Sequence, residues 1–154
     1  MAFFAPVLNV LARVLVGYAF MFLVPLAWGW TLDPAGIREV WWESMALTAG
    51  AGFLLWFVTM DYRRELLPRD GFLLVNLVWS VLPAFSAIPL MLAIDGLSFT
   101  DAYFETMSGF TTTGFTVLSG LDQLPVSVNI WRCVLQLFGG LGIMLLVVAV
   151  LPLL

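Results

Sequence analysis

Four long apolar runs, at residues 3–30, 44–60, 72–94 and 126–154, constrain what this chain can fold into. A helix needs about 20 apolar residues to cross the hydrocarbon core of a bilayer, and it satisfies its own backbone hydrogen bonds there. Hydrophobic residues make up 62% of the chain and charged residues 10%, whereas soluble domains are about half apolar and a quarter charged. The sequence therefore predicts an all-α integral membrane protein with four spans.

A polar island at residues 98–120, between the third and fourth runs, holds the candidate functional segment. Residues 101–109 are too few to span a bilayer but can form about two turns of helix, with Ser98 as a candidate N-cap. The Thr- and Gly-rich segment Thr111–Thr116 follows. Backbone carbonyls and threonine hydroxyls can replace the water around a cation, and glycine permits dihedrals that turn carbonyls inward. This arrangement predicts a cation pore loop.

The distribution of arginine predicts the orientation in the membrane. Half of the six basic residues are Arg63, Arg64 and Arg69, and none occurs between Asp70 and Asn129. The positive-inside rule places this arginine-rich loop in the cytoplasm. Two crossings precede the loop and one separates it from the polar island. We therefore predict a multi-pass protein of the inner (plasma) membrane, surrounded by lipid, with a cytoplasmic N-terminus and the island outside.

Composition also narrows the class of function. A net charge of -4 argues against nucleic-acid binding, which requires a basic face. The chain has no histidine, the commonest general base and metal ligand. We predict no enzymatic activity, no catalytic residues and no organic cofactor. The lone Cys133 lies in an apolar run and is predicted to be a small buried hydrophobe.

The pore-loop residues resemble those of a known family. Thr112–Thr116 is similar to the TVGYG filter of potassium channels, with Thr116 in place of the last glycine. The longer segments Glu105–Leu118 and Trp131–Ile143, together with Arg69–Leu73 upstream, resemble the first pore module of the TrkH family. That family belongs to the TrkH/KtrB/HKT superfamily of potassium transporters. The resemblance covers essentially the whole chain.

The resemblance implies an organisation and an ion. It implies a leading transmembrane helix pair with its arginine-rich loop at residues 1–68, and a helix–pore loop–helix module at residues 69–154. K+ is the implied transported ion. Thr112, Thr113 and Gly114 would offer carbonyls to it, flanked by Thr111 and Phe115.

The resemblance also implies partners. The family's complete chain carries four pore modules, whereas the filter pattern appears once here. We therefore expect the N-terminal part of a longer potassium uptake protein, with the remaining modules in the same chain or in other subunits. A short protein that assembles as a tetramer is the alternative. A homodimer and a cytosolic nucleotide-binding regulatory subunit are implied by the resemblance alone.

A second class of function stays open at this point: a non-transporting membrane scaffold or assembly subunit. The small-residue patch Ala49–Gly52 permits close helix packing, which suits such a role. Gly139, Gly140 and Gly142 permit either close packing or a break in the last helix beneath the filter. The sequence does not choose between these two uses.

Charged residues near the apolar runs also have two interpretations each. Arg13 either snorkels to the interface or forms an ion pair inside the protein. Arg132 is either a structural anchor or an electrostatic element near the pore. Glu105 either holds the loop by hydrogen bonds, which we favour, or biases the field toward cations. Asp33 is predicted to cap the second helix, with Pro34 at its first position.

Overall fold

The computed structural model describes residues 4–62 and 67–150. Its elements are α1 (Ala5–Ala19), the 3-10 helix η1 (Phe20–Phe22), α2 (Leu23–Leu32), α3 (Ala35–Thr59), α4 (Pro68–Ala93), α5 (Phe99–Phe110), the 3-10 helix η2 (Leu121–Gln123) and α6 (Val126–Val150). No strand occurs in these ranges. The all-α prediction is confirmed, while Arg63, Arg64 and residues 151–154 lie outside the described residues.

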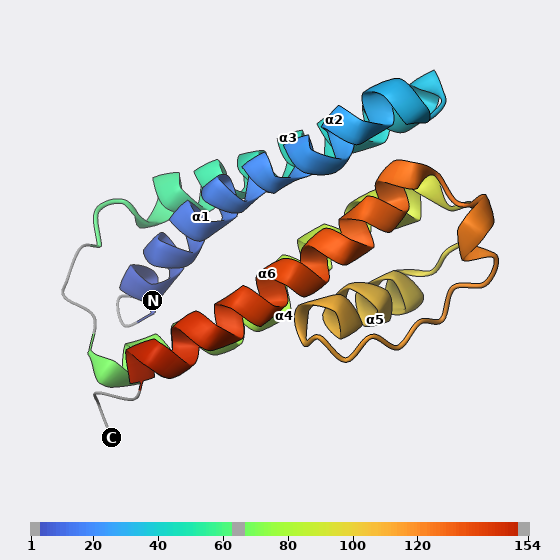
Figure 1. Cartoon of the computed structure of the whole chain (residues 1–154). Helices are drawn as coiled ribbons and strands as arrows, with labels where there is room; N and C mark the ends of the chain where they lie inside the picture. The colour runs from blue at the N-terminus through green and yellow to red at the C-terminus, as the bar shows by residue number, and fades with distance from the viewer. Residues whose placement is uncertain (1–3, 63–66, 151–154) are drawn as a thin grey trace.

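Two antiparallel helix pairs make up the fold (Figure 1). In the first pair, α1 and α2 follow one another as one long rod and α3 returns beside them. In the second pair, α4 and α6 run in opposite directions. The shorter helix α5 packs on both α4 and α6, and an extended segment leads from its end to η2 (Figure 1). The pairs contact each other through α1 with α4 and α2 with α6.

Three helices in the described ranges are long and apolar enough to cross a membrane. They cover Ala5–Leu32, Arg69–Ala93 and Val126–Met144, and they coincide with the first, third and fourth predicted spans. The predicted span at residues 44–60 lies in α3, which is not among the three. The first third of α3 carries Arg38, Glu39 and Glu43, so a shorter apolar stretch remains. This second span stays a prediction.

Trp131 of α6 is fully buried where the two helix pairs meet. Its ring centroid lies 4.7 Å from that of Phe22 and 5.8 Å from that of Trp41. The indole N–H of Trp131 donates to the carbonyl oxygen of Ser86 at 3.2 Å, and that of Trp41 donates to Ser127 Oγ at 2.9 Å. Buried indoles need such partners. These contacts attach the first pair to the second at one defined position.

Asp33 caps a helix other than the one predicted from the sequence. The N-cap of α3 is Pro34, without a side-chain cap. The carboxylate of Asp33 instead accepts from the backbone N–H groups of Val126 at 2.7 Å and Ser127 at 2.9 Å. A helix N-terminus has unpaired N–H groups and a partial positive charge, and the packing of α2 on α6 brings one beside Asp33. The predicted cap was therefore wrong.

Cys133 is also placed differently from its prediction, because it is exposed on α6. The buried stripe of α6 consists of Val128, Trp131 and Leu135. These residues follow the helical spacing of one face, and Cys133 lies on another face. The prediction of a buried cysteine was therefore wrong: an apolar run in a membrane helix does not say which side is covered by protein.

Glycine at position 139 permits the close approach of α5 and α6. A Cβ atom there would overlap the carbonyl oxygen of Phe110, whereas a Cβ at the adjacent Gly140 would meet Thr112 Cγ2 at an ordinary 3.6 Å. Helix α6 is continuous through both positions. Gly139 therefore serves close packing and not a helix break. In the predicted patch on α3, Gly52 has the same role, because its Cβ would lie 2.8 Å from Val16 Cγ2.

We predict that Gly139→Ala destabilises the protein while Gly140→Ala does not. Both substitutions gain about 1 kcal/mol of helix propensity. Only Gly139→Ala forces α5 away from α6, and overpacking of this kind costs about 1–3 kcal/mol or more. Thermal unfolding of the two variants in detergent, followed by size-exclusion chromatography, measures the difference. Equal unfolding midpoints would contradict the close contact.

Candidate pore loop

Helix α5 re-enters the molecule from the end of α4. Ser98 Oγ accepts from the backbone N–H of Asp101 at 3.1 Å, which confirms the predicted N-cap. The helix has 12 residues and ends at Phe110, against Gly139 near the middle of α6. Its C-terminal end, which carries a partial negative charge, therefore lies about halfway along the spans (Figure 1).

Helix α5 hydrogen-bonds to the backbone of α4 around Pro83, one of the two prolines inside that helix. A proline removes a helical hydrogen bond and disturbs the preceding turn. The carbonyl oxygen of Ser80, before Pro83, accepts from the hydroxyl of Tyr103 at 3.2 Å. The hydroxyl of Thr106 donates to the carbonyl oxygen of Pro83 at 2.8 Å. A proline inside a membrane helix leaves backbone carbonyls that neighbouring groups must satisfy. Side chains of α5 supply such hydrogen bonds around Pro83.

The backbone turns sharply at the end of α5. The N–H of Thr111 donates to the carbonyl oxygen of Met107 at 2.9 Å. The N–H groups of Thr113 and Gly114 both donate to the carbonyl oxygen of Ser108, at 2.9 and 3.4 Å. These bonds satisfy the last free carbonyls of the helix. From Thr113 to Gly120 the chain has no regular secondary structure and runs back beside α5 toward η2 (Figure 1).

Two residues of the predicted filter adopt left-handed backbone conformations. Gly114 has φ of 77° and Thr112 has φ of 56°. Glycine adopts this region at no steric cost, whereas a β-branched residue there is an outlier. Thr112 is held by its N–H, which donates to the carbonyl oxygen of Gly109 at 2.9 Å, and by its hydroxyl, which donates to that of Thr111 at 2.7 Å. Strain of this kind concentrates at functional sites.

Three consecutive carbonyls in this segment have no protein partner among the described residues. The carbonyl oxygens of Thr112, Thr113 and Gly114 accept no hydrogen bond within the described part of the chain. The flanking carbonyls differ, because that of Phe115 accepts from Ser108 Oγ at 2.7 Å and that of Thr111 accepts from Thr112. The backbone oxygens of the three predicted ion ligands are therefore available to a ligand, as are those of residues 116–119 farther along the segment.

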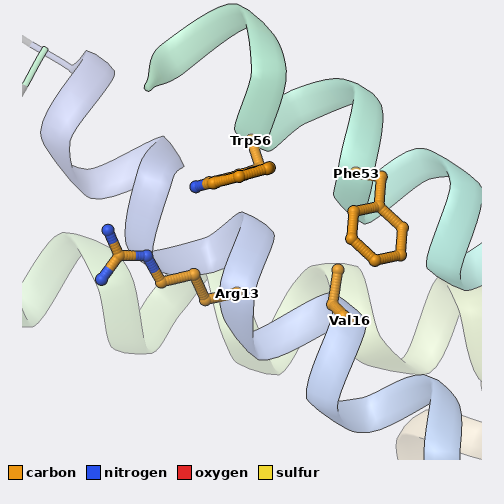
Figure 2. Close-up of a pocket in the computed structure, with 4 residues that line it drawn as sticks. All are labelled: Arg13, Val16, Phe53 and Trp56. Atoms are coloured by element: carbon orange, nitrogen blue, oxygen red, sulfur yellow. The ribbon is translucent and has the colours of Figure 1, made fainter. Parts of the chain in front are cut away.

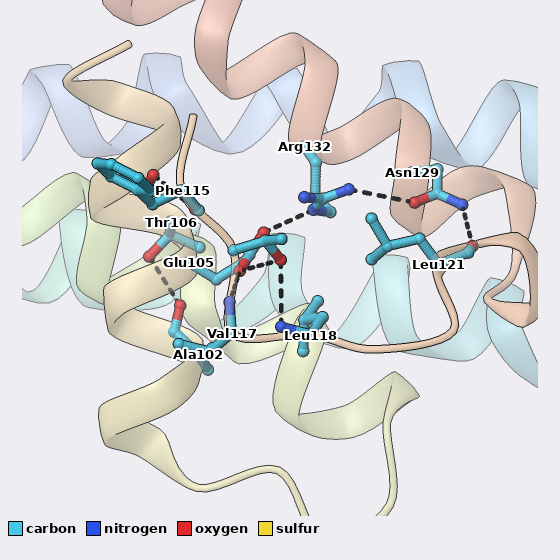
Figure 3. Close-up of polar contacts among 11 residues, drawn as sticks. Ala102, Glu105, Thr106, Phe115, Val117, Leu118, Leu121, Asn129 and Arg132 are labelled. Atoms are coloured by element: carbon cyan, nitrogen blue, oxygen red, sulfur yellow. Dashed lines mark hydrogen bonds and ion pairs between the residues drawn. The ribbon is translucent and has the colours of Figure 1, made fainter. Parts of the chain in front are cut away.

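The buried carboxylate of Glu105 holds the segment that follows the predicted filter (Figure 3). Glu105 is 4% exposed. Its Oε2 accepts from the hydroxyl of Thr116 at 2.9 Å and from the N–H of Val117 at 3.1 Å. Its Oε1 accepts from Nε of Arg132 at 2.7 Å. One side chain thus connects α5, the segment after the filter and α6.

The same polar network extends along α6 toward the connection at η2 (Figure 3). Arg132 Nη1 lies 3.5 Å from Asn129 Oδ1, and Asn129 Nδ2 donates to the carbonyl oxygen of Leu121 at 2.8 Å. Arg132 is thereby an anchor for Glu105, and Glu105 holds the loop. Sequence reasoning missed this pairing, and it missed the part played by Ser108. The available signal was an acidic and a basic residue on either side of the loop in apolar surroundings.

A helix that re-enters between two spans, followed by a loop with three free carbonyls, defines a membrane protein of the pore-loop class. The family model for TrkH, described as a cation transport protein, matches residues 10–154. The chain belongs to this TrkH family of cation transport proteins.

Curated relatives and a solved structure agree with this assignment. The potassium uptake protein TrkH of Halomonas elongata is 40% identical over 147 residues, which are 95% of this chain and 30% of that protein. TrkH of Vibrio parahaemolyticus is 45% identical over 123 residues, 79% of this chain and 25% of that protein. The crystal structure of the potassium transporter TrkH from V. parahaemolyticus matches with a TM-score of 0.87 and 37% identity, covering 97% of this chain and 32% of that one.

The chain is much shorter than the proteins that it matches. It spans 30% or less of the length of these curated relatives. The matches therefore establish the family and the all-helical membrane fold for the matched residues, and the activity of a whole transporter is a proposal.

We predict that Glu105→Ala destabilises the protein by about 3 kcal/mol, because it leaves Arg132 without its buried counter-charge. Thr116→Val removes two hydrogen bonds, the one to Glu105 and the one from the N–H of Leu118, and should cost about 1–2 kcal/mol. In a double-mutant cycle, Glu105→Ala with Arg132→Ala should be less damaging than the sum of the two single changes. Unfolding by titration with a denaturing detergent measures all three. Additive effects of the single changes would contradict the pairing.

Proposed function

We propose that the chain supplies one pore module of a membrane potassium uptake protein. The carbonyl oxygens of Thr112, Thr113 and Gly114 replace part of the hydration shell of K+ as the ion passes. The observation that carries the proposal is the run of three carbonyls without a partner among the described residues, at the end of a re-entrant helix. The curated relatives are named as potassium uptake proteins, which supports K+ as the ion.

The backbone of the loop suits this chemistry. Successive residues of an extended strand point to opposite sides, so a regular strand cannot offer consecutive carbonyls to one ion. Left-handed residues at positions 112 and 114 change that alternation and let neighbouring carbonyls turn to one side. The C-terminal end of α5 contributes a partial negative charge at the same depth. Both features favour a cation.

One loop supplies only part of a ring of oxygens. The loop and helix α5 form a hollow of about 350 Å³ that includes Phe104, Met107 and Phe115. Phe115 is 70% exposed. We infer that further pore modules, in the same chain or in other subunits, cover this apolar surface and complete the ring. A homodimer and a cytosolic nucleotide-binding regulatory subunit belong to the same proposal.

The proposed orientation places the N-terminus in the cytoplasm of a cell whose inner membrane holds the protein. The start of α1 and the start of α4 lie at one end of the helix pairs (Figure 1). Two crossings, one by α1 and α2 and one by α3, return the chain to the side on which it started. This fits a cytoplasmic N-terminus and a cytoplasmic start of α4. The division into a helix pair at residues 1–68 and a pore module at 69–154 is part of the proposal, and α4 begins at Pro68.

We predict that Gly114→Ser weakens potassium uptake or its discrimination against sodium. A side chain at φ of 77° is disfavoured by about 1 kcal/mol, and relief of that strain re-aims the adjacent carbonyls. A change of about 1.4 kcal/mol in relative binding alters selectivity tenfold. The measurement is rubidium uptake, with sodium as competitor, by cells that lack their own potassium uptake systems and express the intact protein.

Gly96→Ser is the matched control. Gly96 also has a left-handed φ of 76°, and a Cβ there would meet nothing within 4 Å, but it lies in the turn before α5. It should carry the same backbone strain without changing sodium competition. Wild-type uptake and sodium competition for Gly114→Ser, at a normal protein level, would mean that Thr111–Thr116 is an ordinary loop and not a filter.

A further inference from the structure

A hollow between α1 and α3 contains the guanidinium of Arg13 on an exposed side of the helix pair. It has a volume of about 320 Å³ and is lined by Arg13 and Val16 from α1 and by Phe53 and Trp56 from α3 (Figure 2). We call it the Arg13 pocket. Arg13 is exposed and forms no ion pair or hydrogen bond with the described residues. The sequence left two roles open for Arg13, snorkelling to the interface or an internal ion pair. The ion pair is absent among the described residues.

Two hydrogen-bond donors face the same space in the Arg13 pocket. Figure 2 shows the guanidinium of Arg13 beneath the indole of Trp56, whose nitrogen lies on the side of the ring nearer that guanidinium. The indole N–H also has no acceptor among the described residues. Within the same ranges, no acidic side chain lines the pocket. A positive charge and a neighbouring N–H without an acceptor call for an anionic oxygen from outside the chain.

Aromatic residues of α3 and its flank give the depth of the pocket. Trp42 and Tyr62 are each 47% exposed, and the helical part of α3 that leads from Trp42 toward Tyr62 ends at Thr59, which makes it about 26 Å long. That length matches the hydrocarbon core, and exposed Trp and Tyr gather at its two boundaries. Trp56 lies three residues before the end of α3 at Thr59, which is about 5 Å along the helix. The pocket therefore opens just inside the boundary remote from the pore loop.

The direction of the Arg13 side chain completes this placement. Side chains on a helix incline toward its N-terminus, and Figure 2 shows Arg13 extending that way along α1. The N-terminal end of α1 is the end near Thr59, because Asn9 Nδ2 donates to Thr59 Oγ1 at 3.2 Å. A snorkelling arginine thus carries its charge from the hydrocarbon to the level of the lipid phosphates.

We propose that the Arg13 pocket binds an anionic phospholipid. The lipid phosphate accepts from the guanidinium of Arg13 and from the indole N–H of Trp56, and an acyl chain lies against Val16 and Phe53. Charge complementarity and depth select this occupant. An arginine remains charged at this depth, and basic pockets between transmembrane helices suit anionic head groups.

The test is lipid binding by the intact protein in detergent, measured by native mass spectrometry. Phosphatidylglycerol and phosphatidylcholine are the two probes. Arg13→Gln should weaken phosphatidylglycerol binding about fivefold, because one basic residue near an anionic surface contributes about that factor, and should leave phosphatidylcholine little changed. Trp56→Phe, which keeps the ring and removes the N–H, should weaken phosphatidylglycerol less. Arg13→Lys should retain most of the binding, which separates charge from folding.

Arg38→Gln is the matched control, because Arg38 lies over the ring of Trp30 at 4.9 Å, toward the opposite end of the helix pair. It should not alter phosphatidylglycerol binding. Three results would overturn the proposal: equal affinity for both lipids, the same loss in Arg38→Gln, or displacement of phosphatidylglycerol by excess inorganic phosphate. A change in oligomeric mass on Arg13→Gln, with lipid binding intact, would assign the pocket to a second copy of the protein instead.

Discussion

The buried carboxylate of Glu105 is the interaction on which the geometry of the pore loop depends. A non-helical segment at membrane depth cannot obtain hydrogen bonds from lipid, so the protein must provide them. Glu105 does this for Thr116 and Val117, while Arg132 balances its charge. The hydroxyl of Ser108 donates to the carbonyl oxygen of Phe115. The loop is thus held by α5 directly after a short stretch whose own carbonyls remain free.

This arrangement divides the polar backbone of the loop into two groups. The N–H groups of Thr113 and Gly114 point back to the carbonyl of Ser108, so the segment remains attached to α5. The carbonyls of Thr112, Thr113 and Gly114 have no such attachment within the described residues. A scaffold protein has no need of consecutive free carbonyls at this depth, where unpaired polar groups are costly. In the proposed function, an ion that enters and leaves supplies the missing partner.

The leading helix pair contributes to the same geometry from a distance. Asp33 caps α6 through two backbone N–H groups, and Trp41 binds Ser127 in the first turn of that helix. Because α6 carries both Arg132 and Gly139, its position decides where Glu105 is held and how closely α5 can approach. The pair formed by α1–α2 and α3 therefore packs as part of the support of the loop.

Much of the fold could be predicted because it depends on local rules. Apolar length predicted the three spans that meet the membrane criterion, Ser98 predicted the start of α5, and Gly114 predicted a backbone conformation suited to glycine. The predictions that failed all depend on contacts between helices. Asp33 caps α6 instead of α3, and Cys133 faces outward, because the packing partner of each helix is invisible in one sequence. The Glu105–Arg132 pair joins residues far apart in the chain, so no local pattern indicates it.

The central claim is that the free carbonyls of Thr112, Thr113 and Gly114 contact the transported ion. The most direct measurement is anomalous diffraction from crystals of the intact protein in rubidium, a heavier substitute for potassium. The account predicts an anomalous peak at about 3 Å from these carbonyl oxygens, on the side away from Glu105, because they replace the hydration shell of the ion. A fully occupied rubidium site elsewhere in the pore, with no density beside these three residues, would contradict it.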